Sequence, residues 1–129
     1  MNTKASLFEY LVLSRGQWDQ DLSKEEIQNA IEDFYAWIDR LVAEGKMKRG
    51  QRLANQGKTV SKSMVTDGPF SETKEVIGGY WFIVARSLRE AAELAAQNPC
   101  AQYGLSFEIR PLEAKRASAY SLANETPAK

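Results

Sequence analysis

The run Y-W-F-I-V-A at residues 80–85 constrains the fold more than any other stretch, because it is apolar at every position. Aromatic and β-branched residues of this kind favour a strand, and a strand points alternate side chains to opposite faces of its sheet. Both faces of this strand therefore need cover. Gly78 and Gly79 directly precede the run and predict a close backbone approach where the strand begins.

Other segments supply partners for this strand. Residues 7–13 predict a strand that is apolar on both faces except at Glu9, and residues 105–110 alternate cleanly before Pro111 ends them. Residues 46–53 and 58–66 are weaker candidates, and the turn at 55–57 predicts that they form an edge hairpin. Its basic residues discourage edge-to-edge pairing or, alternatively, form an anion site. These residues are Lys48, Arg49, Arg52, Lys58 and Lys62.

Two helices are predicted from their start signals. Ser23 and Glu26 have the spacing of a capping box, the apolar residues that follow recur at the period of one helical face, and Gly45 suits the position after the end of the helix. Ser87 and Glu90 repeat the capping-box spacing for a shorter, alanine-rich helix that stops at residues 98–99, Asn-Pro. Its predicted inner face is Leu88, Ala91, Ala92 and Ala95.

The order of these elements is strand, helix, two strands, strand, helix, strand. Two strand–helix–strand units predict an α+β fold of ferredoxin-like type, with an antiparallel sheet, both helices on one face and an extra strand in the middle. The other face of the sheet would expose a larger apolar patch than monomers usually tolerate. We therefore expect a homodimer in which the open sheet faces meet.

Composition excludes several kinds of chemistry. The 129 residues contain no histidine and one cysteine, so histidine-based catalysis, histidine zinc sites and an internal disulfide are impossible within this chain. The formal net charge is zero, which argues against general nucleic-acid binding. No segment has the length of a membrane span and no signal peptide is visible, so we expect a cytoplasmic protein without membrane attachment, metal or cofactor.

The candidate functional side chains cluster around a turn predicted at residues 67–70, D-G-P-F. Asp67 is either an acid–base or ligand-anchoring carboxylate, or a cap for the N–H groups of the turn. Lys74 and one glutamate could line a polar pocket with Asp67, and close carboxylates would push one pKa upward, which suits proton transfer near neutral pH. The candidate ligand-binding residues are Tyr10, Arg15, Arg52, Phe70, Glu72, Lys74, Glu75, Tyr80 and Arg110.

Each of these residues also has a structural alternative. Phe70 could fill the core, residues 72–75 could be a solvated charged segment, and the arginines could form cross-strand ion pairs. The tyrosines could form hydrogen bonds across the sheet. Cys100 has no base near it in sequence, and we interpret it as incidental to function.

The D-G-P-F run, with Glu72, the Lys-Glu pair at 74–75 and Gly-Gly-Tyr at 78–80, resembles the DGPF motif of the YCII-related proteins. Further matches are Glu-Ala at 90–91, Pro99 and Glu-Ile-Arg-Pro at 108–111. The resemblance covers about residues 7–112, with a flexible start at 1–6 and an appended tail at 113–129. It implies a dimeric α+β barrel of ferredoxin-like subunits in a small bacterial protein, often encoded near sigma-factor-type regulators. Some members carry a proposed His–Asp pair, of which this chain could keep only Asp67.

Two classes of function stay open. The first is a dimeric small-molecule-binding or regulatory module, with a regulatory protein as a further possible partner. The second is a cofactor-free enzyme that uses Asp67 as acid or base on a small polar compound.

Overall fold

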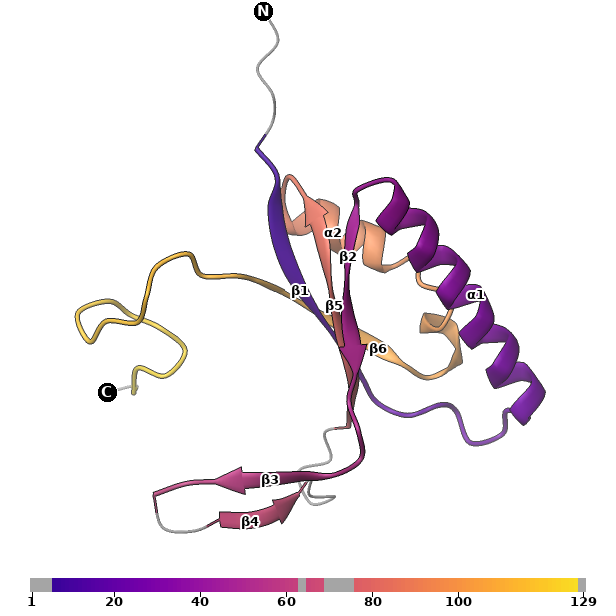
Figure 1. The fold of residues 1–129 in the computed structure, drawn as a ribbon, viewed down its shortest axis with the longest axis horizontal. Coiled ribbons are helices and arrows are strands. Elements are labelled where there is room, and N and C mark those ends of the chain that lie inside the picture. Colours follow the sequence, from indigo (N-terminus) through magenta and orange to yellow (C-terminus); the bar gives the residue numbers. More distant parts are fainter. Residues whose placement is uncertain (1–5, 63–64, 69–75, 128–129) are drawn as a thin grey trace, which may run out of the picture.

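The computed structural model describes residues 6–62, 65–68 and 76–127, with the backbone alone at 66–68 (Figure 1). The main sheet has the strand order β2-β5-β1-β6, every neighbouring pair is antiparallel, and β3 and β4 form a separate two-stranded sheet. The predicted α+β fold is confirmed. The elements are β1 (Phe8–Arg15), α1 (Lys24–Ala43), β2 (Met47–Arg52), β3 (Gly57–Val60), β4 (Val65–Gly68), β5 (Ile77–Ala85), α2 (Leu88–Ala95) and β6 (Ser106–Pro111).

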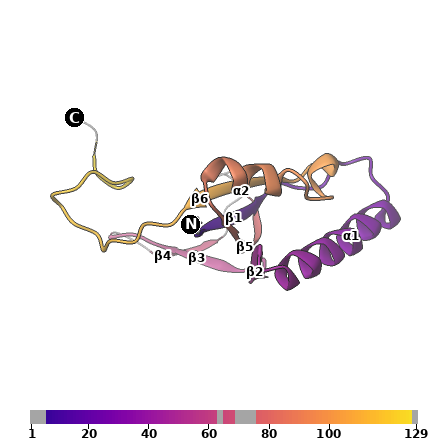
Figure 2. The same cartoon turned by 90° about the horizontal axis from the view of Figure 1, so that it is seen from above.

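Both helices lie on the same side of the main sheet (Figures 1 and 2). β5 is central, between β1 and β2, which explains why its sequence is the most apolar in the chain. Its burial alternates: Gly79, Trp81, Ile83 and Ala85 are buried under the helices, while the residues between them are half-buried or exposed on the open side. Two helical crossovers, one through α1 and one through α2, produce this arrangement.

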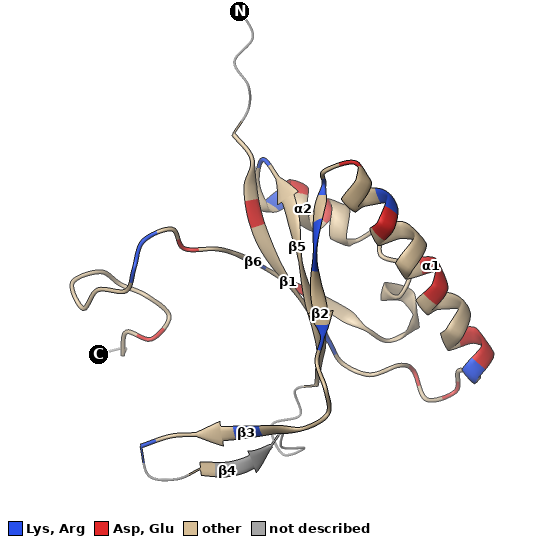
Figure 3. Cartoon of the chain, in the orientation of Figure 1, with Lys and Arg blue, Asp and Glu red and all other residues tan. Residues whose placement is uncertain are grey.

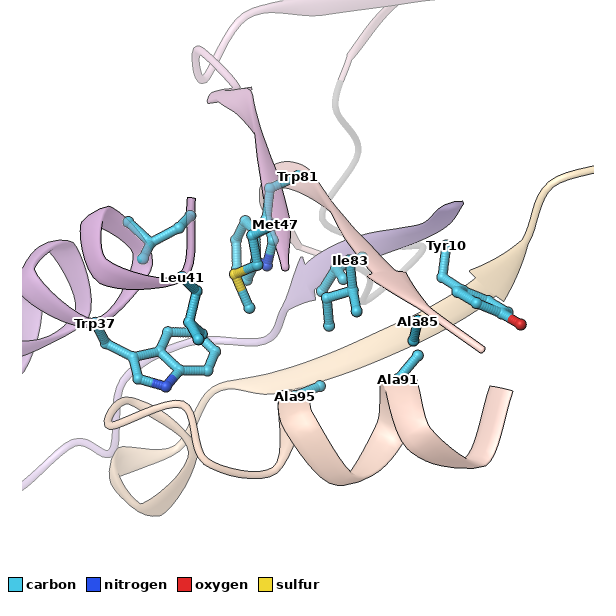
Figure 4. Packing of buried hydrophobic residues seen from close by; sticks show 11 residues of the cluster. Tyr10, Trp37, Leu41, Met47, Trp81, Ile83, Ala85, Ala91 and Ala95 are labelled. Atoms are coloured by element: carbon cyan, nitrogen blue, oxygen red, sulfur yellow. The ribbon is translucent and has the colours of Figure 1, made fainter. Parts of the chain in front are cut away.

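The hydrophobic core fills the space between the sheet and the helices (Figure 4). Val12 of β1 and Ile83 of β5 are fully buried, and Met47 anchors the edge strand β2 opposite Ile83. Trp37 and Leu41 of α1 pack on these residues from the helix side. Burial of this many large side chains is the main stabilising term of the fold, at roughly 1.5–3 kcal/mol for each one fully buried.

The predicted capping box of α1 is present. Ser23 Oγ accepts a hydrogen bond from the backbone N–H of Glu26 at 3.0 Å, and the Glu26 carboxylate accepts one from the N–H of Ser23 at 3.0 Å. Hydrogen bonds to the Glu26 carboxylate from the backbone N–H of Ser23 and from its side chain lower the pKa of Glu26. Gly45 follows the helix with φ +77°, as the sequence predicted.

The start of α2 differs from the prediction. Ser87 Oγ accepts from the N–H of Glu90 at 3.1 Å, but the Glu90 carboxylate accepts from the N–H of Arg86 instead of Ser87, so the reciprocal box is incomplete. The buried face also differs, because Leu88 and Ala92 are exposed while Ala91 and Ala95 pack on the core with Leu94 beside them. α2 has only 8 residues, so its apolar pattern is too short to show reliably which face of the helix is buried.

The predicted hairpin between residues 46–53 and 58–66 is wrong. β2 pairs with β5, where Met47 gains a buried position opposite Ile83, and the next segment divides into β3 and β4, which pair with each other. Val60 and Val65 stay exposed there, so no apolar face ties this hairpin to the main sheet. β2 is nevertheless an edge strand, and Figure 3 shows basic residues along it.

The second face of the main sheet carries no helix. Leu11 and Leu13 of β1 lie opposite Phe82 and Tyr80 of β5 in the strand register, and all four are half-buried. Charged pairs frame this apolar centre, with Glu9–Lys48 towards one edge and Arg15–Glu108–Arg110 towards the other. We call this surface the open face.

Gly104 ties the loop after β1 to the segment before β6. Its φ is +110°, and a Cβ placed there would lie 2.6 Å from the backbone nitrogen of Asp19 and 2.7 Å from the carbonyl oxygen of Gln17. The N–H of Asp19 donates to the carbonyl of Tyr103 at 2.9 Å across the same contact. Gly45 also has a positive φ, but no atom lies within 4 Å of a Cβ added there.

We predict that Gly104→Ala destabilises the protein more than Gly45→Ala. Both changes impose left-handed backbone strain of about 1–2 kcal/mol, and only Gly104→Ala adds an overlap with backbone atoms, worth roughly 1–3 kcal/mol more. Urea unfolding followed by tryptophan fluorescence measures both losses. Equal losses for the two variants would show that the contact between the loops is loose.

Candidate functional site

A cavity of about 710 Å³ lies between the middle of α1 and the sheet. This volume falls within the range of small-molecule pockets, which is roughly 300–1,000 Å³. The walls come from the loop after β1, from α1, from the adjoining ends of β2 and β5, and from the segment that leads into β6. Both strand–helix–strand units of the fold therefore contribute residues to the cavity wall.

The floor of the cavity is the helix-facing side of the sheet. Ser14, Gly79 and Phe107 are register neighbours across β5, β1 and β6, so they share this face, and Trp81 follows two residues after Gly79. The Trp81 and Phe107 rings are in contact, with centroids 5.7 Å apart. The sheet thus offers a mainly aromatic surface.

Helix α1 forms the opposite wall through Ile31, Phe34 and Tyr35. The Phe34 ring lies 5.1 Å from the Trp81 ring and 5.4 Å from the Tyr35 ring, centroid to centroid. Trp18, in the loop after β1, adds another aromatic side chain to the boundary. These rings form a continuous aromatic cluster, which offers ring faces and edges to a flat apolar molecule.

Gly79 lines the cavity at a point where β2 and β5 approach closely. The close approach predicted for the glycine pair is present, since a Cβ at Gly79 would lie 2.9 Å from the carbonyl oxygen of Gln51. Arg52 lies opposite Gly79 in the register, on the same face of the sheet. Arg52 is therefore placed on the cavity side of the sheet.

Arg52 is the single charged residue among the described residues that line the cavity, and it is exposed at the rim. It forms no ion pair with any residue that the structure describes. Neighbouring arginines differ: Arg49 pairs with Asp39 at 2.5 Å, and Arg15 and Arg110 both pair with Glu108. A positive charge is therefore available at the mouth of an otherwise apolar site.

The Trp81 indole N–H is buried and has no hydrogen-bond partner within the described part of the chain. An unpaired buried donor of this kind costs about 1–3 kcal/mol.

Cys100 closes the inner end of the cavity and is buried. Its Sγ lies 3.5 Å from the carbonyl oxygen of Ala30 and donates to it, and its N–H donates to Asn98 Oδ1 at 2.8 Å. Burial, with a smaller contribution from the Asp33 carboxylate, raises the pKa of the Cys100 thiol to about 11. The thiol is therefore neutral near pH 7 and serves as an apolar wall.

The structure brings together two of the ligand-binding residues expected from sequence. Arg52 and Tyr80 both line the cavity, although the Tyr80 ring also contacts the Phe82 ring at 6.0 Å on the open face. Tyr10 is buried in the core, at 6% exposure. Arg15 and Arg110 lie on the open face and pair with Glu108, whose pKa they lower through hydrogen bonds to its carboxylate.

The remaining candidates lie in a part of the chain with little described structure. The Asp67 backbone is in β4, opposite Lys58 of β3, so residues 67–68 are the last two of a strand, and the rest of the predicted turn, residues 69–70, lies outside the described residues. Nothing about the Asp67 side chain is described. Phe70, Glu72, Lys74 and Glu75 lie outside the described residues.

Sequence reasoning missed most of the cavity wall. Phe34 was expected on the apolar face of the first helix and Trp81 in dimer or helix packing; the two rings pack together, and both residues line the cavity. Trp18 was the wall residue easiest to predict from sequence. A tryptophan in a polar connection between a strand and a helix has no place in the core pattern of either element, which suggests a binding role. Ser14, Gln17 and Phe107 gave no such signal.

These features define a class of protein: a small α+β fold with a pocket between an antiparallel sheet and the helices on one of its faces. The family model for the YCII-related domain matches residues 9–114, and the chain belongs to this family. A relative, an uncharacterised protein of Rhizobium meliloti (strain 1021), is 35% identical over 100 residues, which cover 70% of this chain and 78% of the relative.

The described residues contain no group of three or more Cys, Asp or Glu side chains placed to hold a metal ion. Within the same residues, no helix combines the length and apolar character needed to cross a bilayer.

We predict that Cys100 resists thiol reagents in the folded protein. At pH 8 a pKa of about 11 leaves roughly one thiol in a thousand ionised, against about one in ten for a thiol whose pKa is 9.0. Because the thiolate is the reactive form and burial also blocks access, labelling with an aromatic disulfide should be roughly 100-fold slower in buffer than in 6 M guanidinium. The folded-state rate should rise about tenfold per pH unit up to pH 10, because the thiolate fraction does. If the folded protein were labelled as fast as the protein in guanidinium, the Cys100 thiol would not be buried.

Proposed function

We propose that this protein is a small-molecule-binding module whose ligand occupies the cavity between α1 and the sheet. The observation that supports this proposal is the cavity itself: about 710 Å³, with aromatic walls and a few polar groups at its edge. Ligand sites are typically concave, mostly apolar and equipped with a small number of orienting polar groups. Most of the lining residues belong to helices and strands, so the cavity keeps its shape without a ligand.

The described lining residues suit binding. They offer aromatic surface, the hydroxyl of Ser14, the side-chain amides of Gln17 and Gln51, and the charge of Arg52. Hydrogen bonds from such groups orient a molecule, while burial of its apolar part supplies most of the affinity.

A fragment screen by ¹H–¹⁵N NMR tests this proposal. We expect compounds of roughly 10–15 heavy atoms to bind with micromolar to millimolar dissociation constants and to shift resonances of α1 and β5 together. Ile31→Trp adds bulk to the cavity wall and should weaken the best fragments at least tenfold, that is by about 1.4 kcal/mol.

Ala36→Trp provides the matched control for that variant. Ala36 is exposed on the same helix and does not line the cavity, so it receives the same side chain without filling the site. Fragments that bind elsewhere, or that bind the Ile31→Trp protein unchanged, would refute the proposed site.

We further propose that the module is a homodimer whose open faces meet. The isolated chain exposes 10537 Å², whereas a compact monomer of 14.5 kDa exposes about 6,900 Å². The hairpin β3–β4 and the segment after β6 project away from α1 and account for part of the difference (Figure 2). A two-stranded hairpin is at best marginally stable alone, so it also needs a partner surface.

The open face matches a second copy of itself. An apolar centre at Leu11, Leu13 and Phe82 is flanked by both acidic and basic side chains, so a two-fold rotation can place unlike charges opposite each other. Joining two such faces would remove this centre from water on both subunits.

Light scattering at micromolar concentration should give about 29 kDa, twice the chain mass of 14.5 kDa. Phe82→Glu puts a charge in the centre of the open face and should yield a monomer that stays folded. Leu88→Glu is the control, since Leu88 is exposed on α2, on the other side of the sheet. A wild-type mass of 14.5 kDa would contradict the dimer.

A further inference from the structure

We infer that the ligand of this cavity is a small aromatic carboxylate, bound with its ring between α1 and the sheet and its carboxylate at Arg52. This inference rests on the proposed function and adds the chemical class of the ligand. It follows from the separation of apolar surface and charge within the cavity.

The charge at the mouth favours an anion. Arg52 is the single charged residue among the described lining residues, and it has no ion-pair partner in the described part of the chain. Its register position opposite Gly79 places it on the helix-facing side of the sheet, which forms the cavity floor. The planar guanidinium group suits a carboxylate, because it can donate two parallel hydrogen bonds to the two oxygens.

The walls favour a flat ring. Phe34 on α1 is in contact with Trp81 on β5, with ring centroids 5.1 Å apart, and Phe107 extends the same aromatic surface across the sheet. Such a cluster binds aromatic edges and faces, and it would also attract an organic cation. The positive charge of Arg52 repels an organic cation, so the aromatic cluster and Arg52 together favour an aromatic anion.

The size of the cavity sets the scale of the molecule. A space of about 710 Å³ accommodates one or two fused rings with a short substituent. Since Arg52 is exposed while Trp81 is 8% exposed, the molecule would enter ring first and keep its carboxylate near water. This orientation avoids the cost of burying an ionised group.

Three probes with one skeleton test the inference: 2-naphthoate, 2-naphthamide and 2-naphthylmethylamine. NMR titration of the full-length protein should show naphthoate binding about tenfold more tightly than naphthamide, with the amine weakest. The preference should shrink as sodium chloride is raised from 20 to 500 mM, because the charge pair is near solvent.

Arg52→Gln removes the charge and keeps a polar side chain of similar reach. This variant should bind naphthoate and naphthamide within about twofold of each other, with the affinity for naphthamide unchanged. Arg49→Gln is the matched control on the same strand, since Arg49 pairs with Asp39 and does not line the cavity. It should keep the full preference for naphthoate.

Equal binding of naphthoate and naphthamide to the wild-type protein would overturn the inference, as would a preference that survives Arg52→Gln. Failure of naphthoate to bind at all would overturn it too. In each case the proposed binding function is judged separately, by whether any neutral fragment occupies the cavity and loses affinity in Ile31→Trp.

Discussion

The structure depends on the contact between β5 and the helical layer. β5 lies between β1 and β2, and its buried row of Trp81, Ile83 and Ala85 supplies the centre of the core. The row becomes smaller along the strand, from tryptophan to alanine. α2 contacts the small end through Ala91 and Ala95, while the large end packs against Phe34 of α1.

The same gradient explains the position of the cavity. Beyond Trp81 the row continues with Gly79, which has no side chain to pack against α1, and both residues line the cavity. A glycine is needed at this place because the backbone of Gln51 approaches within 2.9 Å of where a Cβ would be. Gly79 thus permits the close pairing of β2 with β5 and also lines the cavity.

The sequence predicted the fold well because its strongest patterns are long. The apolar run of β5, the helical period sustained over the 20 residues of α1 and the alternation of β6 each contain enough repeats to fix element type and inner face. The predictions for α2 and for β3 and β4 were less accurate because these elements are short, and the partner of a short polar strand is decided by distant contacts. Met47 takes its place opposite Ile83, and no pattern within residues 46–66 encodes that pairing.

The candidate site was harder to predict, for a related reason. Arg52 and Tyr80 were expected from their residue types, but most of the wall consists of aromatic residues that also serve as core, such as Phe34 and Phe107. A residue at the edge of a core and one that lines a cavity have the same local pattern, and only the three-dimensional arrangement distinguishes them. The charged residues near the D-G-P-F motif were predicted to bind a ligand because charged side chains in a sequence suggest chemistry, whereas apolar ones suggest a core.

The alternation of β5 also connects the two proposals for this protein. Successive residues point to opposite sides, so Trp81 lines the cavity while Tyr80 and Phe82 lie on the open face. A dimer that fixes the open face would hold the backbone of β5 in place, and with it the floor of the cavity on the other side. Binding in the cavity and association through the open face would then stabilise the same strand, so each would favour the other by linkage.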